Sequence, residues 1–370
     1  MAKKVYVGLS GGVDSSVTAA LLLGLGYDVT AVYMKNWSQD LPGFVCPWKE
    51  DYQDAKRVAV KLGIPFKMYD FEKEYRSKVV DYMIDGYKAG LTPNPDIMCN
   101  QEVKFKLFLE TALEDGADMI ATGHYARIGR GLAIPKGLSP AAGSGPRPVA
   151  GSATLLAGLD KNKDQSYFLY RVNEDALAKT LMPIGDYKKS EVRDIAKKLG
   201  LNTAEKKDSQ GICFVGKVGI KEFLQQFVKT MPGSILDQNG QIVGEHDGAL
   251  FYTIGQRQGL GVGGGLPYYV VGKDMDKNEV YVTTNLQDDR LWHAELELTS
   301  AHWINGEPST SGAYHVRTRY RAELIEVTKI QKLPNGNWQL TLKDEVRAIT
   351  PGQSAVLYDA DRVVGGGIVL

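Results

Sequence analysis

Residues 10–16 read Ser-Gly-Gly-Val-Asp-Ser-Ser, and they directly follow the apolar run at residues 5–9. Gly11 and Gly12 can adopt positive φ angles and let a ligand approach the backbone closely. Successive backbone N–H groups in such a turn can form an anion-binding nest, and a helix that begins near Val13 directs its positive end to the same place. This turn therefore favours a phosphate group, with an ordinary tight turn as the alternative. The spacings of a Walker P-loop and of G-x-G-x-x-G are both absent from it.

A carboxylate and a thiol stand close together in residues 92–100, Thr-Pro-Asn-Pro-Asp-Ile-Met-Cys-Asn. Prolines restrict the backbone on both sides of Asn94, and Pro95 suits the first position of a helix. Asp96 and Cys99 are then three residues apart and share one helix face. A helix N-terminus favours a thiolate, and the carboxylate can act as a general base. The alternative is that Cys99 is a small buried hydrophobe.

The chain has two further cysteines, Cys46 and Cys213. Cys213 ends a polar, glycine-containing stretch and precedes an apolar one, so packing and chemistry are equally supported there. Cys46 has hydrophobic neighbours, which favours packing. Three cysteines without a C-x-x-C pair exclude a disulfide scaffold, and we expect no structural metal site.

Strand and helix signals alternate over the first 125 residues. This alternation predicts an α/β domain with a parallel sheet that helices cover on both faces. Ligands of such sheets bind beyond the carboxyl ends of the strands, where the turn at residues 10–16 and Gly123-His124 are expected to lie. We expect strands at residues 5–9, 29–34, 66–69 and 118–122, and helices at 13–25, 52–62, 71–87 and 102–113.

The composition of the chain and its pattern of helix and strand signals change after residue 125. Residues 131–152 are rich in Gly, Pro, Ala and Ser and have the character of an insertion, and helical signals return at 188–199 and 220–229. Turn signals then separate short β-rich runs, which is typical of small β-barrels. These runs lie at residues 250–254, 268–271, 280–282, 338–342 and 355–358. We expect an α/β domain at 1–215, a central β-rich module at 216–287 and a C-terminal β-barrel at 288–370.

The composition is that of a globular protein, with 43% hydrophobic and 24% charged residues and a formal net charge of zero. No apolar stretch of 18 residues occurs, so we expect a cytoplasmic protein without a membrane partner. Zero net charge argues against a generally basic nucleic-acid binder but leaves room for a local basic face. His315, Arg317, Arg319 and Arg321 alternate along an expected strand and could meet phosphates. The basic helix at 188–199 is better explained by solvation of its charged face.

Residues 10–15 resemble the PP-loop of ATP pyrophosphatases, which cut ATP between its α and β phosphates. The motif would activate a carbonyl oxygen as an adenylate, and two separated cysteines could deliver sulfur as a persulfide. The chain therefore combines an activating half with a sulfur-delivering half of one reaction. Nearly the whole chain is similar to the tRNA-specific 2-thiouridylase family. The most specific segments are Asn-Pro-Asp-x-x-Cys-Asn and Gly-Ile-Cys-Phe. The full set is 10–16, 92–96 with Cys99-Asn100, 121–127, 163–169, 206–214, 252–260, 319–321 and 348–353.

The resemblance implies a role for each matching position. Asp96 resembles the general acid/base, Cys213 the carrier of a persulfide sulfur, and Cys99 the thiol that releases it through a transient Cys99–Cys213 disulfide. The residues implied in ATP binding are Gly8, Leu9, Ser10, Gly11, Gly12, Val13, Asp14, Ser15, Met34 and Gly123. Those implied in tRNA binding are Asn94, Pro95 and Asp96 at the target base, with His124, Lys163, Asp164, Gln165, Arg319, Tyr320 and Gln353 elsewhere.

The resemblance also implies a sulfurtransferase reaction that uses ATP and Mg²⁺. The O2 oxygen of the wobble uridine of tRNA (position 34) is adenylated, and persulfide sulfur then replaces it at C2, which gives 2-thiouridine, AMP and pyrophosphate. The implied partners are tRNAs for Glu, Gln and Lys and a sulfur-donor protein, either a cysteine desulfurase or a relay protein. The alternatives are another PP-loop amidating or ligating enzyme and a non-catalytic RNA-binding protein. Residues 131–152 depart from the family pattern, as does Gln210, where the family more often has Thr.

Overall fold

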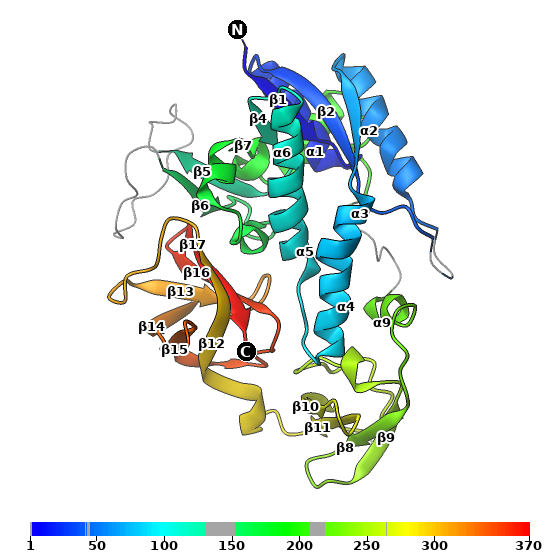
Figure 1. Cartoon of the computed structure of the whole chain (residues 1–370), viewed down its shortest axis with the longest axis vertical. Coiled ribbons are helices and arrows are strands. Elements are labelled where there is room, and N and C mark those ends of the chain that lie inside the picture. Colours follow the sequence, from blue (N-terminus) through cyan, green and yellow to red (C-terminus); the bar gives the residue numbers. More distant parts are fainter. Residues whose placement is uncertain (1, 41, 43–44, 131–151, 208–218, 264) are drawn as a thin grey trace.

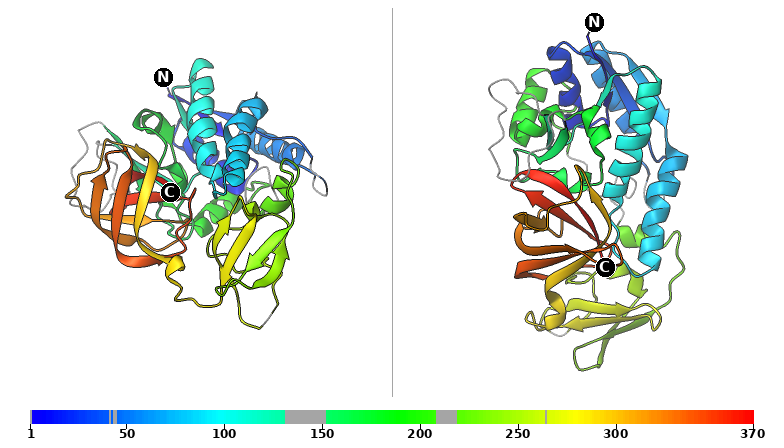
Figure 2. Two further views of the ribbon diagram at one scale, coloured as in Figure 1. Left: turned by 60° about the horizontal axis from the view of Figure 1, so that its bottom comes forward. Right: turned by 60° about the vertical axis from the view of Figure 1, so that its left-hand side comes forward.

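The computed structural model describes residues 2–40, 42, 45–130, 152–207, 219–263 and 265–370. Cys213, Gln210 and all but the last residue of the expected insertion at 131–152 lie outside this part of the chain. The described residues form an N-terminal domain (β1 to α8), a middle module (β8 to β11) and a C-terminal barrel (β12 to β17) (Figure 1). Figure 2 shows the module and the barrel as two separate lobes next to the N-terminal domain.

The N-terminal domain is built on a five-stranded sheet in the order β3-β2-β1-β4-β7, in which every pair of neighbouring strands is parallel. Side chains alternate between its two faces, so that Val5 and Val7 enter one core and Tyr6 the other. This confirms the expected α/β fold with a parallel sheet. The strands are β1 (Lys4–Gly8), β2 (Asp28–Lys35), β3 (Phe66–Asp70), β4 (Met119–Ala121) and β7 (Thr180–Leu181).

Helices cover both faces of this sheet. One face packs against α1 (Val13–Gly24), α2 (Trp48–Leu62) and α8 (Lys189–Lys198), whose apolar residues share a core with Val5 and Val7. The other face packs against two long helical runs, each with a wide, π-helical middle section. The runs are α3 (Glu72–Tyr75), η1 (Arg76–Val80) and α4 (Asp81–Lys88), then α5 (Pro95–Met98), η2 (Cys99–Leu107) and α6 (Phe108–Glu114).

A β-hairpin of the N-terminal domain, which the sequence pattern did not predict, belongs to the sheet of the C-terminal barrel. Strand β6 (Ala153–Ala157) pairs with β5 (Ala126–Arg130) on one side and with β17 (Arg362–Val369) on the other. Short elements follow the hairpin and lead to β7 and α8. They are η3 (Ser166–Leu169), α7 (Glu174–Ala178) and η4 (Pro183–Asp186).

The middle module is a four-stranded sheet in the order β10-β11-β8-β9. The prediction of a strand at residues 250–254 is wrong, because the chain there forms a 3₁₀ turn, η5 (Ala249–Phe251), outside the sheet. Ala249 and Phe251 pack in the module core, whereas Leu250 packs in a core of the N-terminal domain. The helix expected at 220–229 is shorter, because α9 (Ile220–Leu224) continues as i,i+3 turns. The strands are β8 (Gly233–Leu236), β9 (Ile242–His246), β10 (Tyr269–Asp274) and β11 (Glu279–Thr283).

The C-terminal barrel follows the short turn η6 (Asp289–Leu291) and closes because β12 pairs with both β15 and β17. The prediction that the basic residues from His315 to Arg321 alternate along one strand is wrong beyond Arg317, where β13 ends. The chain then turns, with Arg321 at φ +63°, so Arg319 and Arg321 do not share a strand face with Arg317. The strands are β12 (Trp292–Trp303), β13 (Tyr314–Arg317), β14 (Ile325–Lys332), β15 (Trp338–Arg347), β16 (Ser354–Asp359) and β17.

Ion pairs reinforce the junction between the N-terminal domain and the barrel. Asp164 is buried, lies 3.2 Å from Arg317 and accepts hydrogen bonds from the N–H groups of Gly158 (2.9 Å) and Ser166 (3.0 Å). No helix in the described part of the chain combines the length and apolar character that a membrane span requires.

We expect Asp164→Ala to lower the free energy of unfolding by about 3–5 kcal/mol. The largely buried Arg317 guanidinium then has no carboxylate to balance its charge. Urea denaturation measures this loss. The matched control is Glu307→Ala, which removes an exposed partner of Lys332 and should cost under about 1 kcal/mol. Equal losses in the two variants would show that the Asp164 pair does not hold the barrel in place.

Candidate active site

The turn at residues 10–16 lies at the carboxyl end of β1 and at the N-terminus of α1. Gly11 has φ +75°, as expected, whereas Gly12 is extended at φ −96° and directly precedes the helix. The Ser15 hydroxyl accepts a hydrogen bond from the N–H of Ser10 (3.2 Å) and donates one to the Gly12 carbonyl (3.2 Å). The prediction of positive φ is thus confirmed at Gly11 and wrong at Gly12.

Glycines bring the neighbouring strands close to this turn. A methyl group on Gly123, just after β4, would lie 2.7 Å from the backbone nitrogen of Ser15, and one on Gly8 would lie 2.9 Å from the Cε of Met34. Side chains at these two positions would therefore fill the space at the sheet edge. The structure thus places Gly8 beside Met34 and Gly123 beside Ser15 at the carboxyl ends of the strands, where the turn and Gly123 were expected to lie.

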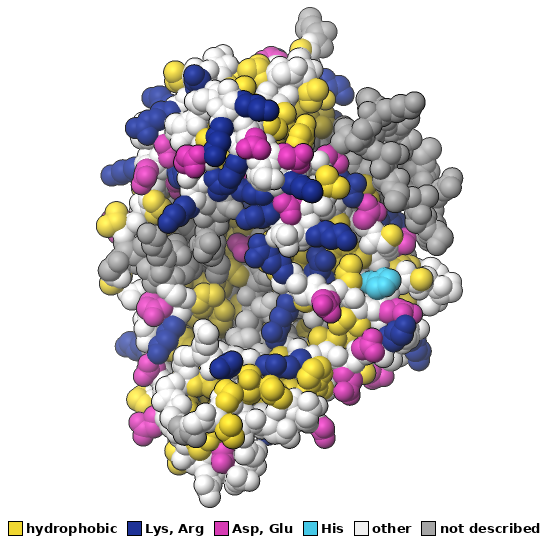
Figure 3. Space-filling view, turned by 180° about the vertical axis from the view of Figure 1, so that it is seen from behind, with side chains coloured by type: hydrophobic (Ala, Val, Ile, Leu, Met, Phe, Trp, Pro, Cys, Tyr) yellow, Lys and Arg dark blue, Asp and Glu magenta, His cyan; other side chains and the backbone are white. Residues whose placement is uncertain are grey.

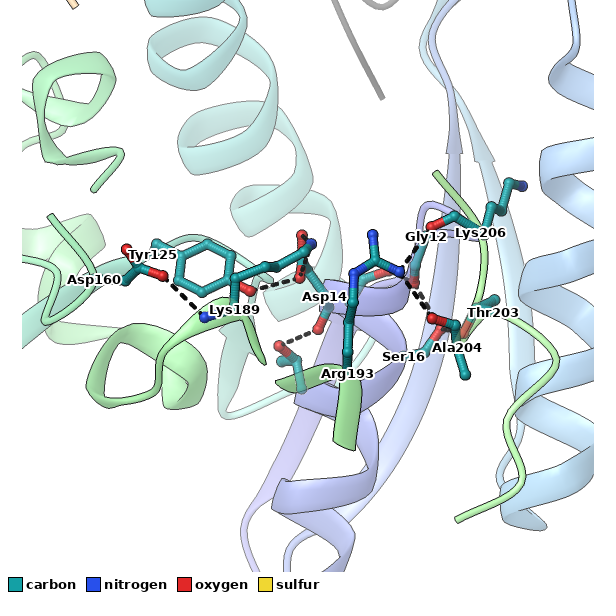
Figure 4. Close-up of polar contacts among 12 residues, drawn as sticks. Gly12, Asp14, Ser16, Tyr125, Asp160, Lys189, Arg193, Thr203, Ala204 and Lys206 are labelled. Atoms are coloured by element: carbon teal, nitrogen blue, oxygen red, sulfur yellow. Dashed lines mark hydrogen bonds and ion pairs between the residues drawn. The ribbon is translucent and has the colours of Figure 1, made fainter. Parts of the chain in front are cut away.

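An ion pair joins the turn to α8 (Figure 4). Lys189 Nζ lies 2.7 and 2.8 Å from the two carboxylate oxygens of Asp14, and the Tyr125 hydroxyl donates to the same carboxylate at 2.8 Å. The Lys189 N–H donates to Asp160 (2.9 Å). Sequence reasoning assigned the 188–199 helix to a solvated face and missed Lys189. The sequence feature that could have identified Lys189 is its position in the first turn of a helix, since the turn at residues 10–16 carries a carboxylate, Asp14, that needs a cation.

A second lysine lies beside the turn. The backbone carbonyl of Asp51, in the first turn of α2, contacts the site where Gly11 would carry a Cβ. Lys206 Nζ lies 2.8 Å from Asp51 and 2.6 Å from Asp54. Burial lowers the pKa of Lys206, but the hydrogen bonds to Asp51 and Asp54 outweigh it and hold the pKa above its ordinary value. Lys206 is therefore a cation at neutral pH.

The carboxylate and the thiol lie at the start of the helical run α5–η2–α6. Pro95 is its first residue, as expected, and the Asn94 side chain caps it by accepting a hydrogen bond from the Ile97 N–H (3.4 Å). Cys99 is 3% exposed. Burial raises the pKa of Asp96, and Lys104 offsets this in part. The position of Cys99 relative to Cys213 lies outside the described residues.

His124, which follows Gly123, packs against this helical run. It is buried, its Nδ1 lies 2.8 Å from the Thr122 hydroxyl, and its ring centre is 5.5 Å from that of Phe105 on η2. Burial, together with the nearby Lys104 charge, lowers the pKa of His124 well below its ordinary value. The imidazole is therefore neutral at physiological pH.

Several residues expected at the RNA surface make internal contacts. The Gln165 side chain accepts a hydrogen bond from the Tyr125 N–H (3.0 Å), and Asp164 is buried as described above. Arg319 donates to the Thr350 hydroxyl (3.1 Å) and to the Ala348 carbonyl. The half-buried Tyr320 stacks on Phe168 with ring centres 4.5 Å apart, and Lys163 is also half-buried.

Lys and Arg side chains gather on the face opposite to that seen in Figure 1. Figure 3 shows them along the middle of this face, from the N-terminal domain towards the middle module, next to a hollow. A local concentration of positive charge on a chain of zero net charge suits an anionic polymer.

Three family models match the chain in succession. They are the tRNA methyl transferase HUP domain over residues 3–217, the tRNA methyl transferase PRC-barrel domain over 221–284 and the aminomethyltransferase β-barrel domain over 293–369. A tRNA-specific 2-thiouridylase MnmA from Bacillus subtilis (strain 168) is 45% identical over an alignment 372 residues long, which covers 99% of this chain and 94% of the relative. The MnmA of Listeria monocytogenes serotype 4b (strain CLIP80459) is 45% identical over the same shares of both chains.

The chain belongs to the tRNA-specific 2-thiouridylase family. Although two of the matching models are named after methyl transfer, the relatives that span the whole length are 2-thiouridylases. A solved 4-thiouridine synthetase–RNA complex with bound ATP is 19% identical and has a TM-score of 0.38, with 60% of this chain and 50% of that chain covered.

The raised pKa of Asp96 predicts how the stability of the protein depends on pH. The folded protein holds the Asp96 proton more tightly than the unfolded chain, so this contribution to stability is present at low pH and is lost as the pH rises through the raised pKa. We expect Asp96→Asn to raise Tm at pH 7 by about 1–3 °C, with the gap narrowing towards pH 4. Thermal unfolding across this pH range measures it.

Asp115→Asn provides a control of opposite sign. Hydrogen bonds from Lys67 (2.5 Å) and Tyr69 (2.6 Å) hold the pKa of Asp115 below its ordinary value, so its contribution is present at neutral pH and is lost as the pH falls. This variant should melt below the unmodified protein at pH 7. A Tm difference for Asp96→Asn that does not vary with pH would contradict the burial of an ionisable carboxyl at this position.

Proposed function

We propose that this protein is an ATP-dependent tRNA 2-thiouridylase that converts the wobble uridine of tRNA (position 34) to 2-thiouridine. The observation that carries the proposal is 45% identity with the Bacillus subtilis 2-thiouridylase over 99% of the chain. The phosphate-type turn at residues 10–16, the partly buried carboxylate of Asp96 and the buried thiol of Cys99 supply the two chemistries that such a reaction needs.

In the activating half of the proposed reaction, ATP and Mg²⁺ bind at the turn of residues 10–16. The proposed binding residues are those that the family resemblance implies: Gly8 to Ser15, Met34 and Gly123. Their arrangement fits a polyphosphate, since Gly11 has a positive φ that shapes the turn and α1 directs its N-terminus at the turn. ATP supplies an adenylate leaving group for the O2 oxygen of uridine. Lys189 neutralises the Asp14 carboxylate, so that this charge does not repel the phosphates.

In the sulfur-delivering half, Asp96 is the proposed general acid/base. Burial raises its pKa, which favours the protonated form that a general acid needs. A persulfide on Cys213 attacks C2 of the adenylated base with its outer sulfur, and AMP leaves. The Cys99 thiolate then attacks the inner sulfur of Cys213, so the S–S bond breaks, sulfur stays on the base and a Cys99–Cys213 disulfide forms. An external thiol reductant restores both thiols.

The remaining features of the proposal concern partners and organisation. The RNA substrate is the anticodon region of tRNAs for Glu, Gln and Lys, and a cysteine desulfurase or a relay protein provides the persulfide. We assign the PP-loop domain to residues 1–215, the central module to 216–287 and the tRNA-binding barrel to 288–370. Removal of a base from the anticodon stack costs a few kcal/mol, which surface contacts must offset. A cytoplasmic location follows from a tRNA substrate.

The decisive experiment incubates the protein with unmodified tRNA, ATP, Mg²⁺ and a sulfide source and analyses the nucleosides by mass spectrometry. We expect an ATP-dependent 2-thiouridine peak that Asp96→Asn reduces at least about 100-fold, because the base loses its proton partner. Cys213→Ser should abolish turnover with a protein sulfur donor, while Cys46→Ser, at a cysteine in the hydrophobic core, is the matched control.

Two results would contradict this function. Release of AMP and pyrophosphate without a thionucleoside would keep the adenylation step and redirect the search to another nucleophile, as in an amidating or ligating enzyme. RNA binding without either product would favour a non-catalytic RNA-binding protein.

The Asp14–Lys189 pair gives a prediction for the ATP site. We expect Lys189→Met to weaken binding of a non-hydrolysable ATP analogue by about tenfold or more, because the Asp14 carboxylate then faces the phosphates without its cation. Titration calorimetry in the absence of tRNA measures this Kd. Lys189→Arg should retain affinity, and Lys188→Met, at the exposed neighbouring lysine, is the matched control. Equal affinity in Lys189→Met and Lys188→Met would exclude this role.

A further inference from the structure

The connection between α4 and α5 is bonded to both of the other lobes. The Thr92 N–H donates to the Pro351 carbonyl (2.9 Å), and the Thr92 carbonyl accepts from the side-chain amide of Gln353 (2.7 Å). The Thr92 hydroxyl lies 3.3 Å from the hydroxyl of Thr253 in the middle module. Residues of the barrel and of the middle module therefore converge on one residue, two positions before the Asn94 helix cap.

This approach is too close for side chains at several positions. A methyl group on Gly352, which has φ +89°, would lie 2.7 Å from the Thr92 nitrogen. On the other side of the connection, a methyl group on Gly86 of α4 would lie 2.8 Å from the Pro93 ring. The backbone at Thr92 and Pro93 is thus packed between α4 and the barrel, and Thr92 is 8% exposed.

The barrel segment that contacts Thr92 is itself tied to the middle module. Arg319 donates to the Ala348 carbonyl and lies 3.4 Å from the Ile254 carbonyl. The Cβ of Ala348 would lie 2.5 Å from a methyl group on Gly255. Burial lowers the pKa of Arg319, in keeping with its place inside this contact. Residues 348–353 therefore form the meeting point of all three lobes.

We propose that Gln353 is a positioning residue: its side-chain amide holds the Thr92 carbonyl and so makes the placement of Asn94 and Asp96 depend on the seating of the C-terminal barrel. The inference deepens the proposed function, on which it rests for its catalytic meaning. Burying the Thr92 carbonyl without a donor is costly, and the Gln353 amide is the donor that the structure provides. In this arrangement the base-binding loop is ordered by the same lobe that is expected to hold the tRNA.

This role differs from a direct RNA contact of Gln353. A residue that only contacts RNA affects the Kd of tRNA and leaves the free protein unchanged. A residue that positions the loop alters the free protein around Thr92 and lowers the rate of thiolation of bound tRNA. The two roles therefore separate in an experiment without RNA and in a split between binding and turnover.

The test compares Gln353→Ala and the isosteric Gln353→Glu, which lacks the amide donor, with the unmodified full-length protein. Gln331→Ala is the matched control, because it removes a barrel glutamine that bonds to Gln339 (2.7 Å) away from Thr92. Hydrogen–deuterium exchange of the RNA-free protein reports on the amides of Thr92, Asn94 and Asp96. We expect exchange about fivefold faster in both Gln353 variants and unchanged in the control.

The second arm measures the Kd of tRNA and the single-turnover rate of thiolation. We expect a Kd within about twofold of the unmodified protein and a rate lowered about tenfold or more. The proposal is overturned if exchange stays at the unmodified level, or if the change in Kd accounts for the whole loss of activity. If the unmodified protein forms no thionucleoside, the proposed function fails, while the exchange arm still decides whether Gln353 holds the loop.

Discussion

The close packing of Gly123 against the first turn of α1 is the constraint on which the candidate site depends. Because Gly123 has no side chain, the end of β4 reaches the backbone of Ser15 directly. The next residue, His124, turns the other way and stacks on Phe105 of the helical run that begins with Asp96 and Cys99. Two consecutive residues at one strand end therefore join the turn at residues 10–16 to the helical run that carries the carboxylate and the thiol.

Burial determines which charges remain at this strand end. It keeps the imidazole of His124 neutral, and it raises the pKa of Asp96. The Asp14 carboxylate, by contrast, retains a cation in Lys189. The turn at residues 10–16 thus carries a paired carboxylate, whereas burial disfavours the charged forms of His124 and Asp96.

Local patterns predicted the N-terminal domain well because its strands and helices follow one another along the chain. The parallel sheet, the helix at Pro95 and the ligand edge at Gly123 were all deduced from such patterns. Sequence patterns did not predict the structure where the partner of a residue lies far along the chain. Nothing near residue 156 indicates pairing with residue 362, and an apolar run at residue 250 does not distinguish a strand from a buried turn. Lys189, and the internal contact of Gln353, were hidden for the same reason.

The pairing of β6 with β17 has a consequence for the order in which the chain acquires its structure. The sheet that contains the barrel is finished by residues of the N-terminal domain, which leave the ribosome long before β17 is synthesised. Until β17 is synthesised, the edge of β6 that faces away from β5 has no strand with which to form hydrogen bonds. Contacts so distant in sequence form slowly, so completion of the barrel is expected to be a late event in folding and to make the two ends of the protein one cooperative unit.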